Sequence, residues 1–376
     1  MKRETILVGI TLMKHLVANL NLADLGGANK VTVTVVDQLI KLEEDVSVVT
    51  LYKPDLHSIY NQWKMDLSHV EIYYKSIPFG LGRSRILTYY RLYSAILRAF
   101  RKYKPDQIIF FDDVIDPKNK IRGKIVLYAH FPFSLRIRYF DRRSDKLRTK
   151  IYENLFKLTP EADLILANSS KTSECIKTAW RRDAKIVYPP VDTVNFRPLE
   201  KENTVAMLGR FCPYKHIEDG IEAVALSETK PRLCILGLAG SNAYLKRLKA
   251  LVRRRGIERS TTFLVDASLE HVKRTLGQAK VFIHPCQKEP FGIAVVEAMA
   301  AGCVPIVYKD WGPWVDIAAR GKYGLGFKTV NDLAERIDAV ISDETKFTRF
   351  SEIARSRAGS FDEERFRKKV GGILCA

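Results

Sequence analysis

Two glutamates eight positions apart, Glu289 and Glu297, are the residues of this chain best placed to do chemistry. They bracket an apolar, helix-forming run at residues 290–296. Residues 281–285 before them are typical of a short buried strand that ends at a proline, and Gly302 after them is a typical helix C-cap. This order puts Glu289 just before a helix N-terminus, whose free N–H groups attract anions, and Glu297 about two turns inside the helix. One carboxylate can therefore meet hydroxyl groups at the helix mouth, and the other a group farther along.

Taken alone, the pair also fits a structural explanation, with Glu297 a solvated helix residue and Glu289 a favourable charge near a helix start. The flanking residues favour a site. Phe-Gly-Ile, Val-Val-Glu, Met-Ala-Ala-Gly and Gly-Pro-x-x-Asp-Ile follow one another between residues 291 and 317. These pieces resemble the nucleotide-sugar segment of retaining glycosyltransferases of the GT-B fold, family GT4, especially the eukaryotic lipid-linked-oligosaccharide mannosyltransferases. The resemblance implies an α/β protein in which two Rossmann-like, doubly wound domains face each other across a cleft, with a C-terminal helix that crosses back to the first domain.

The length and composition are compatible with such a protein. A chain of 376 residues is too long for one small core and suits two domains. Its six cysteines include no Cys-x-x-Cys pair, so neither a zinc site nor a disulfide framework is indicated. No stretch approaches the roughly 18 apolar residues of a membrane span, and the N-terminal residues do not resemble a signal peptide. We therefore expect a cytoplasmic protein, soluble or peripheral on the cytosolic face of a membrane.

The charge is strongly positive and uneven. The formal net charge is +19, and residues 101–150 hold fourteen Lys/Arg against six Asp/Glu. Within the basic segment 136–150, cations alternate with apolar residues, which suits a surface that rests on anionic lipid or holds a phosphorylated lipid acceptor. A solvated basic face is the alternative. Nucleic acid is not expected, because no RNP-type motif, zinc finger or helix-turn-helix pattern is present.

Strand and helix patterns alternate along both halves of the chain, which favours parallel, doubly wound sheets. Residues 30–40 fit a strand or a helix by pattern, and the resemblance assigns them to a helix. Two prolines near residue 190 indicate a connection between domains. We expect an N-terminal acceptor-binding domain at 1–190, completed by a crossing helix at 358–376, and a nucleotide-sugar-binding domain at 200–357. The expected strands are at residues 6–10, 46–51, 105–111, 124–128 and 163–169, then at 205–209, 233–237, 262–264, 281–283 and 304–307.

Cations and glycines also occur where the resemblance implies donor contacts. Arg210 and Lys215 lie in a loop after a strand, where α/β sheets bind ligands. In GT4 enzymes the matching residues hold the donor pyrophosphate and stabilise the leaving nucleoside diphosphate in place of a metal ion. Gly26 and Gly27 precede the expected first helix and would let the backbone approach a ligand. The alternative for Arg210 and Lys215 is that they are ordinary surface cations. The alternative for Gly26 and Gly27 is that they lie in a plain flexible loop.

The resemblance gives the remaining residues their roles. His130, after another expected strand, would lie beside the donor sugar and the leaving phosphate, although a lone histidine is more often structural. Glu297 would accept hydrogen bonds from the donor ribose, and Glu289 would bind sugar hydroxyls or stabilise positive character at the anomeric carbon. The backbone amides at the helix start would meet sugar or phosphate oxygens. They belong to Phe291, Gly292 and Ile293.

The sequence thus predicts a retaining glycosyltransferase that moves a hexose, mannose from GDP-mannose, onto a glycan or polyprenyl-linked acceptor at the cytosolic membrane face. It would need neither cofactor nor metal. UDP-glucose or UDP-N-acetylglucosamine is the nearest alternative donor, because residues 265–267 lack the glycine common near the base. A non-catalytic GT-B-like protein that binds polyanions is the rival from another class. Asp112 and Asp113 suggest a divalent-ion site or, preferably, a solvated loop.

Overall fold

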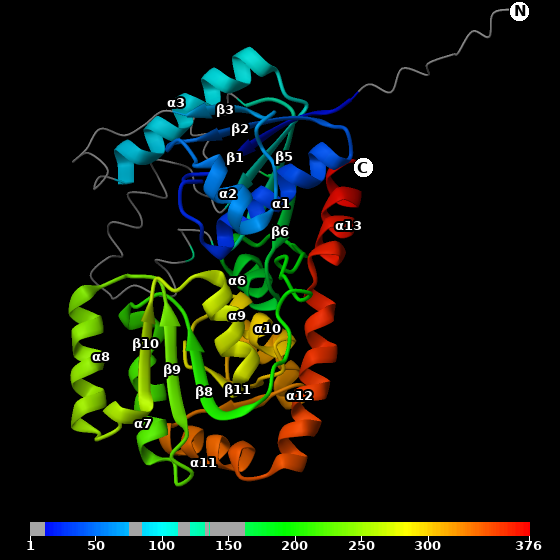
Figure 1. The fold of residues 1–376 in the computed structure, drawn as a ribbon. Coiled ribbons are helices and arrows are strands. Elements are labelled where there is room, and N and C mark those ends of the chain that lie inside the picture. Colours follow the sequence, from blue (N-terminus) through cyan, green and yellow to red (C-terminus); the bar gives the residue numbers. More distant parts are fainter. Residues whose placement is uncertain (1–11, 75–84, 112–120, 132–134, 136–161) are drawn as a thin grey trace, which may run out of the picture. The chain divides into compact units, whose positions relative to one another are not determined.

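The structure is a computed structural model in which the chain divides into two compact units (Figure 1). One unit comprises Met1–Leu166 and Arg367–Ala376, the other Ala167–Phe366. The expected strand at residues 6–10, the aspartates Asp112 and Asp113 and the basic segment 136–150 lie outside the described residues. The structure describes residues 12–74, 85–111, 121–131, 135 and 162–376.

The first sheet has seven strands in the order β3-β2-β1-β4-β5-β6-β7. Strand β1 pairs with β2 and β4, β2 pairs with β3, and β4 pairs with β5, all in parallel. This confirms the expected doubly wound arrangement. The strands are β1 (Lys14–Ala18), β2 (Asp45–Thr50), β3 (Glu71–Tyr74), β4 (Gln107–Phe111), β5 (Lys124–Ala129), β6 (Leu164–Ala167) and β7 (Lys185–Ile186).

Strand β1 was not expected, because its sequence Lys-His-Leu-Val-Ala begins with two polar residues. Leu16 and Val17 are fully buried, and the buried His15 contacts Gln107 on the neighbouring strand β4. The histidine side chain is thus accommodated by a partner that local periodicity does not reveal. Burial on both faces is typical of parallel sheets.

The helices of the first unit are α1 (Gly27–Lys41), α2 (Leu56–Trp63), α3 (Arg85–Tyr103) and the later part of α13 (Glu363–Leu374). Helix α1 confirms the assignment of residues 30–40 to a helix. Its valines and threonines have low intrinsic helix propensity, yet most of the helix is buried, so tertiary packing decides its conformation. Gly26 is its N-cap and provides no side-chain cap.

The second sheet has six strands in the order β10-β9-β8-β11-β12-β13, and every strand pair is parallel. The chain runs outward from β8 in one direction and then from β11 in the other, so the topological switch point lies between these two strands. Ligands of open α/β sheets bind at the carboxyl ends of the strands at such a point. The strands are β8 (Glu202–Leu208), β9 (Arg232–Gly237), β10 (Thr261–Val265), β11 (Ala279–His284), β12 (Val304–Tyr308) and β13 (Leu325–Phe327).

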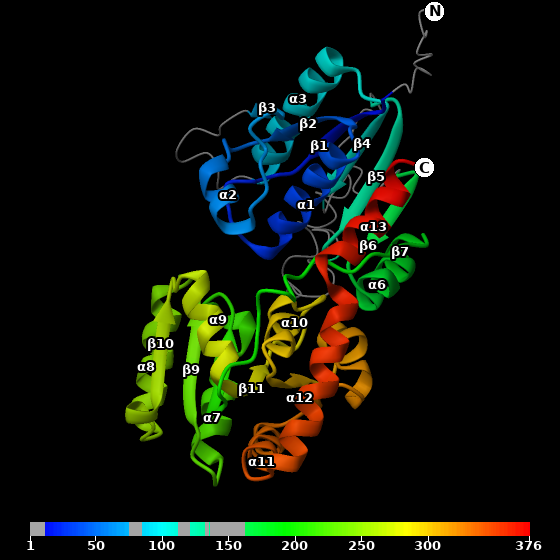
Figure 2. The ribbon, with the colours of Figure 1, turned by 45° about the vertical axis from the view of Figure 1, so that its right-hand side comes forward.

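Helices cover both faces of this sheet (Figure 2). One apolar core lies under α7 (Ile217–Leu226), α8 (Asn242–Arg254) and α11 (Val330–Ile341). The other lies under α9 (Leu269–Gln278), α10 (Ile293–Ala300) and α12 (Glu344–Ala358). Helix α6 (Ser170–Trp180) precedes them in the chain, and its N-cap is Ser169.

A buried carboxylate fixes the Gly-Pro-x-x-Asp-Ile segment. Asp316 is 3% exposed and accepts hydrogen bonds from the backbone and hydroxyl of Ser170 and from the Tyr188 hydroxyl, the last at 2.9 Å. Burial and the Asp316 charge raise the pKa of Tyr188 to about 12, so this phenol stays a donor. Asp316 thus links Ser170, the first residue of α6, to Tyr188 in the proline-containing connection, and all three lie in the second unit.

Among the described residues, no helix is both long and apolar enough to cross a membrane.

Candidate functional site

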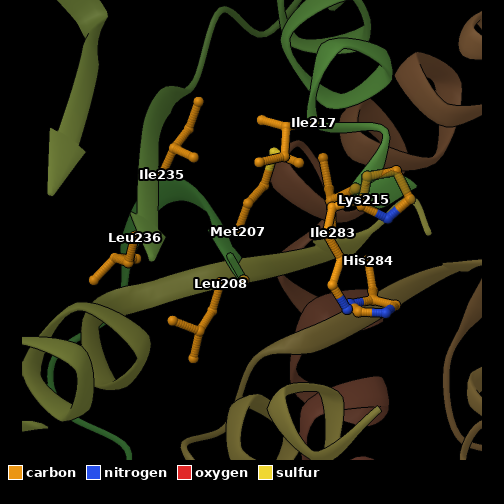
Figure 3. Close-up of a pocket in the computed structure, with 10 residues that line it drawn as sticks. Met207, Leu208, Lys215, Ile217, Ile235, Leu236, Ile283 and His284 are labelled. Atoms are coloured by element: carbon orange, nitrogen blue, oxygen red, sulfur yellow. The ribbon is translucent and has the colours of Figure 1, made fainter. Parts of the chain in front are cut away.

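A small pocket lies at the carboxyl ends of β8, β9 and β11 in the second unit. Figure 3 shows its apolar side chains together with the nitrogen-bearing side chains of Lys215 and His284. The three strands meet at the switch point of the sheet, so the position is the one expected for a ligand. The apolar part of the lining comes from Met207, Leu208, Ile217, Ile235, Leu236, Ile283 and Pro285.

Lys215 and His284 converge on the carboxylate of Glu289. Lys215 Nζ forms an ion pair with Glu289 Oε2, and His284 Nε2 lies 3.3 Å from the same oxygen. The side chains of Lys215 and Glu289 are each 17% exposed and that of His284 is 5% exposed. A single carboxylate oxygen therefore holds two nitrogen groups in a site that excludes most water.

The charges of this cluster stabilise each other. Burial acts to raise the pKa of Glu289, but the Lys215 charge and the neighbouring His284 imidazole outweigh it and hold this pKa well below its usual range. Burial acts to lower the pKa of Lys215, but Glu289 outweighs it and holds this pKa above the usual range. Glu289 is therefore an anion and Lys215 a cation at neutral pH. Glu289 can accept hydrogen bonds and stabilise positive charge, but it cannot donate a proton.

A short loop places Lys215. After β8, Pro213–Lys215 forms one 3-10 turn, and His216 at φ 52° ends it in the left-handed conformation. The thiol of Cys286 donates to the Tyr214 carbonyl at 3.3 Å and so ties this turn to the segment after β11. Burial raises the pKa of Cys286 to about 12, which keeps its thiol protonated and a donor.

Two glycines shape the turn that carries Glu289. Gly292 is the N-cap of α10 at φ 100°, a conformation that disfavours side chains. The Gly312 amide donates to the Glu289 carbonyl at 3.1 Å, and a Cβ at Gly312 would clash with the Pro290 carbonyl oxygen. The loop after β12 can therefore press against the Glu289 turn only because position 312 has no side chain.

The turn at residues 265–267, which has no glycine, holds Asp266 in a left-handed backbone conformation. Asp266 has φ 52°, in the left-handed region that aspartate tolerates better than most residues. Its amide donates to the Gly237 carbonyl at 2.8 Å, and its carboxylate accepts from the Ala239 amide at 2.7 Å. Asp266 thus forms this turn without a glycine. Its carboxylate is already engaged with the Ala239 amide.

The structure brings together some of the expected donor residues. Lys215 and Glu289 contact each other directly, and Arg210 is exposed in the same loop as Lys215. Phe291 is buried, and its ring packs against Tyr188, so only its backbone is available to a ligand. Gly292 and Ile293 begin α10, and Glu297 is half-buried within that helix.

The remaining expected residues belong to the first unit. Gly26 and Gly27 begin α1. His130 follows β5, is 9% exposed and packs its ring against Phe111 and Tyr128, with centroid distances of 6.0 and 5.0 Å. That these residues join the donor site stays a prediction.

His284 is a site residue that the sequence analysis did not single out. It was counted as the last residue of a buried strand. Two signals could have revealed it: a histidine at the carboxyl end of a strand next to the switch point, and its position only five residues before Glu289.

His284 is expected to make the folded state sensitive to mild acid. Burial lowers the pKa of this imidazole below its ordinary 6.5, although Glu289 acts in the opposite direction. The unfolded chain therefore takes up the proton first, and His284 stabilises the fold above pH 6.5 but loses that contribution as the pH falls. Between pH 6.5 and 5 the free energy of unfolding should fall by up to about 1.4 kcal/mol per pH unit from this group.

Urea unfolding of the chain and of His284→Gln checks this, with tryptophan fluorescence as the signal, because three of the four tryptophans lie in the second unit. The variant should show the shallower dependence on pH over this range. Glu289 does not contribute there, since its unfolded pKa is 4.5 and its folded pKa is lower. Equal slopes for the two proteins would contradict the prediction.

The fold and this site define a class. Residues 193–357 match the family model of glycosyl transferases group 1, and residues 25–195 match that of Glycosyltransferase Family 4. Since the two matches together cover residues 25–357, the chain belongs to the family 4 glycosyltransferases of the GT-B fold.

Curated relatives of the chain carry the name GDP-Man:Man(3)GlcNAc(2)-PP-Dol alpha-1,2-mannosyltransferase. The Dictyostelium discoideum protein is 28% identical over 59% of this chain and 50% of its own length. The Homo sapiens protein is 28% identical over 54% of this chain and 46% of its own length. The Candida glabrata protein is 30% identical over 54% and 42%, respectively. The chain thus spans about half the length of the curated relatives it matches.

Solved structures agree with the fold. Sucrose-phosphate synthase from Thermosynechococcus elongatus superposes with a TM-score of 0.79 at 18% identity, over 96% of this chain and 98% of that one. The HepE protein of Anabaena, solved in complex with UDP-glucose, superposes with a TM-score of 0.74 at 19% identity, over 96% and 99%. At these identities the likeness establishes the fold.

Proposed function

We propose that this protein is a retaining glycosyltransferase that moves mannose from GDP-mannose onto a glycan or polyprenyl-linked acceptor. The observation that carries the proposal is the Lys215–Glu289–His284 cluster at the switch point of the second sheet. It lies within residues 193–357, the part of the chain that matches glycosyl transferases group 1. The names of the curated relatives support GDP-mannose as donor and a lipid-linked oligosaccharide as acceptor.

In the proposed reaction, Lys215 and Arg210 bind the donor pyrophosphate. Lys215 is paired with Glu289 in this structure, so donor binding gives its ammonium group a second anionic partner. Both cations offset the negative charge that accumulates on the nucleoside diphosphate as it leaves. Glu297, about one turn into α10 rather than the expected two, accepts hydrogen bonds from the ribose.

Glu289 is assigned to the sugar. As an ionised carboxylate it accepts hydrogen bonds from sugar hydroxyls and stabilises the positive charge that develops at the anomeric carbon. The bond from this carbon to the phosphate oxygen breaks, and a bond to the acceptor oxygen forms on the same face. The acceptor proton passes to the leaving phosphate oxygen, so no external reactant is required.

The second candidate is the use of UDP-glucose or UDP-N-acetylglucosamine as donor. The UDP-glucose complex of HepE, a structural neighbour, is the observation that favours it. A polyanion-binding protein without activity is the other rival, since the net charge is +19.

A panel of GDP- and UDP-sugars tests the proposal by thermal shift and by donor hydrolysis. GDP-mannose at about 100 times its dissociation constant should stabilise the protein by about 2.7 kcal/mol, and UDP-sugars by less. GDP-mannose should also be hydrolysed slowly when no acceptor is present. No shift and no hydrolysis with any nucleotide sugar, together with salt-dependent binding of RNA, would support the polyanion-binding rival instead.

A further inference from the structure

A second cluster of donor groups lies in the first unit. It joins His15 on β1, Glu44 in the turn before β2 and Cys375 after α13, which are distant in sequence. One ligand atom from each lies within 4.8 Å of the others, and His15 Nε2 is 3.8 Å from Glu44 Oε2. None of these residues belongs to the proposed donor site.

The imidazole of His15 is oriented so that an unused lone pair faces this cluster. His15 is fully buried, and its Nδ1 lies 3.2 Å from Gln107 Oε1. Because an amide oxygen only accepts, Nδ1 carries the proton and Nε2 is a bare acceptor. Histidine ligands of metals characteristically donate their other N–H to such a second group.

Nothing in the described part of the chain satisfies that lone pair. Nε2 of His15 is buried without a hydrogen-bond partner and faces the Glu44 carboxylate, which is itself an acceptor. Glu44 Oε2 already accepts from the Met13 amide at 2.7 Å. The Cys375 thiol completes the cluster on the same side. A buried acceptor opposite an anion is costly unless a cation lies between them.

We propose that His15, Glu44 and Cys375 bind a zinc ion, with water as the fourth ligand. Imidazole, carboxylate and thiolate together form a donor set that Zn²⁺ prefers. Zinc bonds of about 2.0–2.3 Å require ligand atoms roughly 3.3–3.8 Å apart, so the side chains need to approach by about 1 Å. On binding, the Cys375 thiol loses its proton to solvent, and the ion neutralises the charges that now repel the histidine lone pair.

The site would fasten the end of the chain to the first sheet. Two other contacts hold the same segment: Gln107 Nε2 donates to the Leu374 carbonyl at 3.4 Å, and Lys124 Nζ donates to the Ala376 carbonyl at 3.1 Å. Gln107 thus contacts both the His15 ring and the segment that carries Cys375. A metal at this point would stabilise the folded state of the first unit because the unfolded chain does not preserve the cluster.

Cobalt(II) is a suitable probe, because a thiolate bound to it gives a charge-transfer absorption in the near ultraviolet. The full chain, reduced and freed of metal with a chelator, should show this band on addition of one equivalent of Co²⁺. Zinc should then remove the band and raise the unfolding temperature. Cys375→Ser should abolish the band and weaken Zn²⁺ binding about 10²-fold.

Two comparisons make the result decisive. The cluster of His284, Cys286 and Glu289 also has metal-ligand spacing, so Cys286→Ser must retain the band. Metal-free Cys375→Ser should unfold at the same temperature as the metal-free parent chain, since its cysteine is only half-buried. A band that persists in Cys375→Ser, a band lost in Cys286→Ser, or no band with the parent chain at millimolar Co²⁺ would each overturn the proposal.

Discussion

Glu289→Gln is expected to lower the rate of mannose transfer about 10³-fold, the largest effect of any single substitution in the second unit. The amide has nearly the same shape as the carboxylate but no charge. It can still accept a hydrogen bond from the sugar, yet it cannot stabilise positive charge at the anomeric carbon. The initial rate of GDP-mannose consumption with acceptor, at saturating donor, measures the loss.

The same substitution leaves Lys215 without its counter-ion in a site where the side chain is 17% exposed. The free energy of unfolding should therefore fall by up to about 3 kcal/mol, and rates must be measured well below the unfolding temperature. Glu344→Gln is the matched control, since it also breaks a lysine–glutamate pair, with Lys280, away from the site. A Glu289→Gln variant that retains a tenth of the activity would contradict the assigned role.

Lys215→Met is expected to weaken the binding of GDP about 10²-fold, because the cation of a lysine that lines the pocket is lost while its aliphatic stem is approximately kept. Isothermal titration with GDP alone measures this effect independently of catalysis. Lys280→Met is the control, because this lysine is 10% exposed and also pairs with a glutamate. Equal GDP affinities for Lys215→Met and the parent chain would remove Lys215 from the pyrophosphate site.

The double variant Lys215→Met/Glu289→Gln separates stability from function. Each single change leaves one buried group unpaired, whereas the double change removes both charges. The double variant should therefore be more stable than either single variant. Its GDP affinity should stay as low as that of Lys215→Met, because the lost phosphate contact is not restored.

The sequence was most informative where function is concentrated in one segment. Glu289 and Glu297 lie close together in the chain, and the strand, loop and helix around them were predicted from local pattern alone. The contact between Glu289 and Lys215 joins residues 74 positions apart. That they lie at one edge of the sheet was predictable from the parallel topology, but their direct ion pair was not.

Features that depend on tertiary partners could not be predicted from the sequence pattern. His284 appeared as the end of a strand, and β1 was missed because the burial of His15 depends on Gln107, 92 residues away. Helix α1 was ambiguous by pattern, since its valines are kept helical by packing rather than by propensity. The absence of Cys-x-x-Cys spacing gave no indication of a cysteine, histidine and glutamate brought together by the fold.

A crystal of the protein soaked with GDP-mannose tests the assignment of the donor site. We expect density for the nucleotide over the carboxyl ends of β8 and β11, with the pyrophosphate within hydrogen-bonding distance of Arg210 and Lys215. The mannose should contact Glu289 at the start of α10. Nucleotide bound elsewhere on the chain, or no density at millimolar GDP-mannose with the site open to solvent in the crystal, would contradict it.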